Sequence, residues 1–142
     1  ATPFMQTDFD ERDGQLSPDG RWIAYVSNEL GRDEVYVVPF PGPGGKWQIS
    51  TAGGRAPLWT RGGREIIYQA PGDEIMAVEV STVPTFRAGV PRALFKIRLR
   101  PPPGRQFDVT PDGERFLVNM RPGDQVSDPI TLVQNWAAGR KR

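Results

Sequence analysis

Short apolar runs of strand length recur along this chain, and each follows a turn that ends in glycine. Three segments share an apolar residue, a Ser or Thr, a turn of three residues, two polar or bulky residues and a short apolar run: 16–26, 59–69 and 109–119. The turn glycines are Gly20, Gly63 and Gly113, separated by 43 and then 50 residues. A strand-rich repeat of about 40–50 residues is typical of β-propeller blades.

Each repeat contains the signals of a small antiparallel sheet. Pro-Asp-Gly at 18–20 and 111–113 is a tight-turn sequence, because Pro presets φ and Gly accepts a positive φ; the second repeat has Arg-Gly-Gly at 61–63 instead. The turn joins a short first strand to a buried second strand. Polar turns then lead into third strands at 35–38, 75–78 and 130–133, and outer strands fit 46–50 and 91–95.

The third repeat has no candidate for a fourth strand after residue 133. Only 135–138, compatible with one helical turn, and a basic tail follow. A spare outer strand is found at the other end of the chain, in Pro3, Phe4, Met5, Gln6 and Thr7, which resemble 47–51 in their place before the next blade. The boundaries that follow are an exchanged outer strand within 1–12, blades at 13–52 and 53–98, and an incomplete blade at 99–142.

The repeat also resembles a known family. Residues 16–27, followed by 33–37, are similar to the TolB-like, WD-like propeller repeat, and 37–51 and 84–89 resemble the C-terminal propeller tails of bacterial serine/threonine protein kinases. The resemblance implies six blades and a sensory or protein-interaction role. This chain departs from it by supplying three blades and no kinase segment. The predicted fold class is therefore all-β: half of a six-bladed propeller, with three four-stranded antiparallel blades, one completed by strand exchange.

Half a ring predicts a partner, and the partner expected is a second copy. The end faces of the outermost blades would be apolar and exposed, and an unpaired outer strand would leave a sheet edge open. Two copies related by a two-fold axis would cover both, each lending residues 3–7 to the other's third blade. The alternative is a fragment of a larger, kinase-linked propeller with no independent activity.

The amino-acid composition limits the kinds of partner and catalytic site that this chain can have. The 142 residues include 18 basic and 17 acidic ones, a balance that predicts neither nucleic-acid binding nor a membrane-surface role. Cysteine and histidine are absent, which excludes Ser-His-Asp and Cys-His catalysis and leaves the compartment, cytoplasmic or extracytoplasmic, open. No apolar run approaches the roughly 20 residues of a membrane span, and no signal peptide is apparent. We expect no catalytic residue, cofactor or metal.

The candidate binding residues are Arg12, Arg55 and Arg105, each eight positions before a turn glycine. That offset places them at the entry to each first strand, near the mouth of the central channel of the predicted propeller. Clustered guanidinium groups there would bind an anion or an acidic peptide. The alternative is that each arginine pairs with a nearby carboxylate, such as Asp10, Glu11 or Asp108.

Other conspicuous residues have structural interpretations. The aromatic residues at 22, 25, 47, 59 and 68 are expected to pack between blades, and Asp19 and Asp112 to serve the turns. Acidic residues at 33–34 and 73–74 lack the dense alternation of a calcium loop. The leading function is thus a non-catalytic binding or scaffold module; a propeller-type hydrolase or lyase and a purely self-assembling fragment are the alternatives.

Overall fold

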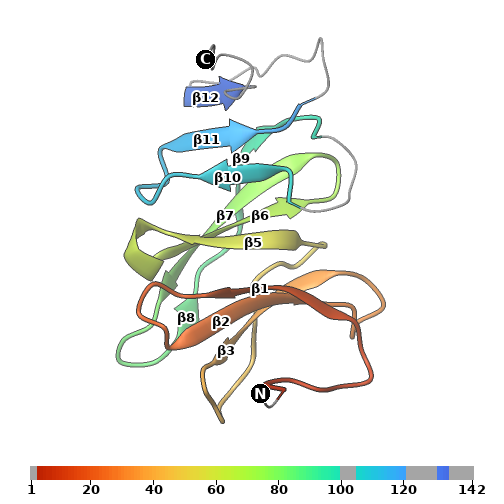
Figure 1. Ribbon diagram of the computed structural model, residues 1–142, viewed down its shortest axis with the longest axis vertical. Helices are drawn as coiled ribbons and strands as arrows, with labels where there is room; N and C mark the ends of the chain where they lie inside the picture. Colours follow the sequence, from red (N-terminus) through yellow and green to blue (C-terminus); the bar gives the residue numbers. More distant parts are fainter. Residues whose placement is uncertain (1–2, 100–104, 121–130, 135–142) are drawn as a thin grey trace, which may run out of the picture.

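The computed structural model describes residues 3–99 and 105–120, together with the backbone of 131–134. The strands form three separate sheets (Figure 1). The first contains four antiparallel strands in sequence order, β1 (Glu11–Leu16), β2 (Trp22–Ser27), β3 (Glu34–Pro39) and β4 (Trp47–Gln48). This sheet confirms the first predicted repeat, although β1 begins just inside the segment assigned to the exchanged strand.

The second sheet follows the same plan with one extra strand. Its members are β5 (Arg55–Thr60), β6 (Glu65–Ala70), β7 (Glu74–Ser81), β8 (Arg87–Ala88) and β9 (Arg92–Lys96), and a 3₁₀ turn, η1 (Arg61–Gly63), links β5 to β6. Both β8 and β9 pair with β7, which is long enough to hold one at each end. The predicted outer strand at 91–95 is confirmed as β9, whereas β8 was not predicted.

The third sheet corrects one expectation. β10 (Phe107–Val109) and β11 (Arg115–Val118) are antiparallel, but β12 (Thr131–Gln134) runs parallel to β11. The prediction of an antiparallel blade is wrong at this pair. Residues 119–130 separate the two strands, and a link of about a dozen residues allows a parallel crossover, whereas the shorter links 28–33 and 71–73 close antiparallel hairpins. Residue 130 and the predicted helical turn at 135–138 lie outside the described residues.

The sheets stack in a row with two apolar layers between them. In Figure 1, β1, β5 and β10 lie side by side on one side of the stack, and β5 contacts both of the others. The layer between the first two sheets includes Ala24, Val26, Ile66 and Tyr68. The layer between the second and third sheets includes Ile67, Phe107, Phe116, Val118 and their neighbours. The central sheet is therefore covered on both faces, and every residue of β6 up to Gln69 is buried.

The same positions of each repeat face the same way. Ile66 and Phe116, three residues after the turn glycine, pack on the preceding sheet, whereas Ala24 and Ile67, one residue later, pack on the following sheet. This alternation follows from the two-residue period of a strand. The protein is thus all-β, with three stacked sheets built on one repeated pattern. Within the described part of the chain, no helix has the length and apolar character to cross a membrane.

Candidate functional site

The strands are joined by turns at two opposite ends of their length. One of these ends carries the glycine turns, which join β1 to β2, β5 to β6 and β10 to β11. In the first turn the Ser17 hydroxyl donates to Asp19 at 2.5 Å and accepts from the Trp22 N–H at 3.1 Å, while the Arg21 N–H donates to Asp19 at 3.1 Å. Gly20 has φ +71°, a value that glycine adopts without steric cost. These bonds fold the chain back from β1 into β2.

The third turn repeats this geometry atom for atom. Thr110 donates its hydroxyl to Asp112 and accepts from the Arg115 N–H at 3.0 Å, and the Glu114 N–H donates to Asp112 at 2.9 Å. Gly113 has φ +75°. The hydroxyl of Thr110, and then the backbone N–H, lower the pKa of Asp112. Its carboxylate is therefore occupied in holding the turn, as predicted.

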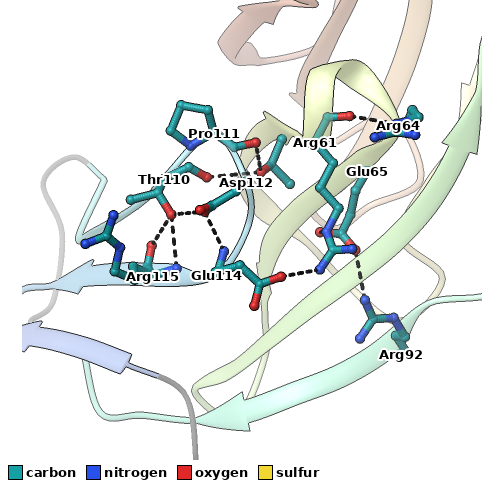
Figure 2. Close-up of polar contacts among 10 residues, drawn as sticks. Arg61, Arg64, Glu65, Arg92, Thr110, Pro111, Asp112, Glu114 and Arg115 are labelled. Carbon is teal, nitrogen blue, oxygen red and sulfur yellow. Dashed lines mark hydrogen bonds and ion pairs between the residues drawn. The ribbon is translucent and has the colours of Figure 1, made fainter.

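The second turn contacts the third. The Arg61 N–H donates to the Pro111 carbonyl at 2.7 Å, and the Thr60 hydroxyl lies 3.0 Å from the same oxygen. Figure 2 shows Glu65 between two arginines: Arg61 Nε lies 3.3 Å and Arg92 Nη2 2.8 Å from its carboxylate. Glu65 is almost completely buried, and its charge is compensated by this pairing. This end of the molecule is a satisfied structural network.

The opposite end carries two of the three candidate arginines. Arg12 is paired across the ladder with Val26, and Arg55 is paired with Gln69, which are equivalent positions of the two repeats. The next residue has a positive φ in both cases, +56° at Asp13 and +52° at Ala56. A bulge follows each arginine, since the register shifts there in both ladders. The structure therefore gives Arg12 and Arg55 the same backbone setting.

Arg105 is not equivalent in structure. The Asn119 N–H donates to the Gln106 carbonyl at 2.8 Å, so Gln106 takes the place opposite β11 that Arg12 and Arg55 occupy in their ladders. The third ladder has a continuous register over Phe107–Val109, without the bulge. The repeat offset thus identified two matching positions, and the third is displaced by one residue.

The two equivalent arginines differ in their partners. Arg12 donates to Asp10 at 2.6 Å and also to Asp33, so the alternative of carboxylate pairing, with Asp10 named in advance, is confirmed for this residue. Arg55 is exposed and forms no ion pair with any described residue. Among the candidates placed in equivalent settings, Arg55 is the one that remains available to a ligand.

Arg55 borders a pocket whose wall is held by a buried carboxylate. Glu34 is fully buried and accepts from the Gly53 N–H at 3.0 Å, from Arg32 Nε at 2.6 Å and from the Ser50 hydroxyl. The Ser50 hydroxyl also lies 2.8 Å from the Val35 N–H. These bonds fix residues 50–53, which link the first sheet to the second.

The pocket itself has a volume of about 290 Å³ and lies where the two sheets meet. Its charged lining residues are Arg32, Asp33, Arg55 and Asp73, and Gln69 lines it as well. Gly53 cannot be replaced without movement, since a Cβ there would come within 2.8 Å of the Pro71 ring and φ is +97°. Neither the buried Glu34 nor this pocket was predicted, because an acidic turn residue in a sequence carries no sign of burial.

Four of the five aromatic residues pack between the first two sheets, as the sequence predicts: Trp22, Trp47, Trp59 and Tyr68. Tyr25 is buried beside Tyr36 of its own sheet instead and belongs to neither layer between the described sheets. Trp22 contacts Trp47 and Phe86, with ring centroids 5.6 and 5.1 Å apart. Trp59 donates its indole N–H to the Gln15 carbonyl at 2.9 Å, which ties β5 to β1. Burial raises the pKa of Tyr68 to about 12. These rings hold the first two sheets together.

The N-terminal segment at 3–7 forms no strand and pairs with no strand of the described residues. Phe4 packs edge-on against Phe40 with centroids 5.0 Å apart, which places the segment beside the end of β3.

Among the described residues no group of three or more acidic side chains is arranged to hold a metal ion. No model of a known protein family matches the chain, and no curated protein matches it.

Proposed function

We propose that this chain is a non-catalytic scaffold module: two copies close a 3+3 six-bladed ring that presents its rims to other proteins. Three observations support the ring. The sheets are stacked in a row, their first strands lie on one side, and each repeat directs equivalent residues to the preceding and following sheets. A stack built in this way is closed by further sheets of the same kind.

The observation that carries the proposal is the face of the first sheet that has no preceding sheet. Pairing across β1 and β2 places Leu16 opposite Ile23, and pairing across β2 and β3 places Tyr25 opposite Tyr36. Their counterparts in β6, Ile66 and Tyr68, are buried between sheets. Leu16, by contrast, is 54% exposed and Ile23 is half-buried, whereas Tyr25 and Tyr36 on the same face are already buried within the single chain, so the uncovered part of this face is the part around Leu16. An apolar face in a soluble protein favours association.

The third sheet offers a surface of the complementary kind. In the strand register, Leu117 is paired with Asp108 of β10 and with Val133 of β12. In the first and second sheets, the face that corresponds to Leu117 packs against the sheet that follows. A hollow of about 420 Å³ adjoins it, lined in part by Asp108 and Arg115. In a two-fold pair, the first sheet of each copy meets the third sheet of the other, so both uncovered faces are used in one closed assembly. The edge strand β12 would receive residues 3–7 of the partner copy.

Cross-linking tests this arrangement directly, because the chain has no cysteine of its own. Ile23→Cys and Leu117→Cys chains are mixed and treated with a short bifunctional maleimide. The ring predicts cross-linking between the two variants, with little between identical ones. The matched control is Leu30→Cys mixed with Leu117→Cys, since Leu30 is exposed in the turn between β2 and β3, outside the strands. Cross-linking of Ile23→Cys to itself, or of neither pair, would refute the proposal.

A further inference from the structure

The pocket beside Arg55 is lined by charged groups, two of which form no ion pair within the described part of the chain, which is a feature of ligand sites. We infer that it binds a small zwitterion of the α-amino acid class, with the carboxylate at Arg55 and the ammonium at Asp73. The site is formed by one chain and lies between its first two sheets, so the inference goes beyond the proposed ring and does not depend on it.

The charges that line the pocket divide into engaged and free groups. Arg32 is held by Glu34 and by the Thr51 carbonyl, 3.0 Å from Nη2, and Asp33 is held by Arg12. Arg55 and Asp73 form no ion pair with each other or with other described residues. The free groups are therefore one cation and one anion. A pocket with both favours a ligand that carries both charges over a simple anion, so the structure changes the acidic-ligand prediction made from the three arginines.

Gln69 adds a directional group. It is only 6% exposed and lines the pocket, and its side-chain amide forms no hydrogen bond with a described residue. Tyr36 Oη is the buried side-chain oxygen or nitrogen without a partner in the described part of the chain, so the amide atoms of Gln69 remain accessible to solvent, and a ligand can bond to them in place of water. Gln69 is also paired with Arg55 across the ladder, which places an amide and a guanidinium at adjoining positions of the site. Together they provide planar hydrogen-bond donors suited to a carboxylate.

The size and rigidity of the pocket limit the ligand. About 290 Å³ lies at the lower end of the range for small-molecule sites, so it suits a single small molecule better than a folded segment. One wall is fixed by the Gly54 N–H, which donates to the Asp33 carbonyl at 2.9 Å, and by the Gly53 N–H bound to Glu34. A wall fixed by backbone hydrogen bonds is formed before the ligand arrives, which lowers the cost of binding.

Titration of the ¹⁵N-labelled chain tests the inference with L-alanine, propanoate and ethylamine as probes. L-Alanine is expected to shift the amide signals of Gly53, Gly54 and Gly72. Propanoate and ethylamine, which each lack one charge, are expected to bind at least tenfold more weakly. Arg55→Gln and Asp73→Asn should each weaken L-alanine at least tenfold, whereas Arg87→Gln, a change in β8 at the other end of β7, should not.

Three results would overturn the site. These are no shift of the three glycine amides by L-alanine, equal affinity for propanoate, or unchanged affinity in Arg55→Gln or Asp73→Asn. The amide spectrum of each variant reports whether it remains folded. Because the titration reads signals within one chain, its failure leaves the ring untested, and failure of the ring leaves the titration valid.

Discussion

Replacing Leu16 with serine is expected to weaken self-association without unfolding the chain. Full burial of a leucine side chain contributes about 1.5–3 kcal/mol. Leu16 is 54% exposed in the single chain, so burying this exposed part in an interface contributes about 1 kcal/mol. A two-fold pair buries the residue twice, which gives about 2 kcal/mol, or roughly a 30-fold increase in the dimer dissociation constant.

The assay is sedimentation equilibrium over a range of concentrations, with circular dichroism as a check on folding. The matched control is Leu30→Ser, because Leu30 is 61% exposed but lies outside the strands. The expected result is a weaker dimer for Leu16→Ser and an unchanged dimer for Leu30→Ser. If both variants weaken association equally, or if neither does, the uncovered face of the first sheet is not the interface and the reasoning fails.

Three further predictions concern the fold. Gly53→Ala should lower the free energy of unfolding by about 2 kcal/mol or more in urea, because a strained φ and a close contact with a proline ring combine there, whereas Gly72→Ala, with positive φ but open space, should cost only about 1 kcal/mol. Ile67→Ala should cost about 2–5 kcal/mol in the same assay by opening a cavity in the central sheet, and Val83→Ala, at an exposed site, less than about 0.5 kcal/mol. The pKa of Asp19 is lowered in the folded state, chiefly by the Ser17 hydroxyl, so its contribution to stability is present above the unfolded-state pKa and is lost as the pH falls through the folded-state pKa. Asp19→Asn should therefore flatten the dependence of stability on pH below about 4, and an unchanged acid limb in urea titrations would argue against this role.

The sequence predicted most of the strands because their signals are local. The glycine turns and the apolar runs after them required only the two-residue period and turn chemistry, and Asp19 and Asp112 perform the turn roles expected of them. β8 was missed because its two residues, Arg87–Ala88, are exposed and continue no apolar run, whereas the equally short β4 lies within the longer run predicted at 46–50. The direction of β12 was missed because it depends on the path of the link before it.

The candidate site was predicted only in part, since it depends on contacts that sequence spacing does not report. The common offset of Arg12 and Arg55 correctly placed them in equivalent settings. It did not reveal that Asp33, from the link before β3, engages only Arg12, or that the third ladder lacks the bulge. The burial of Glu34 likewise arises from the link between sheets folding over it.

The central claim, that two half rings close one another, is tested most directly by the mass of the chain in solution. Light scattering coupled to size-exclusion chromatography measures it without reference to shape. A chain of 15.8 kDa that closes a 3+3 ring should elute as a single species of twice that mass. A uniform species of 15.8 kDa at micromolar and higher concentrations would contradict the ring.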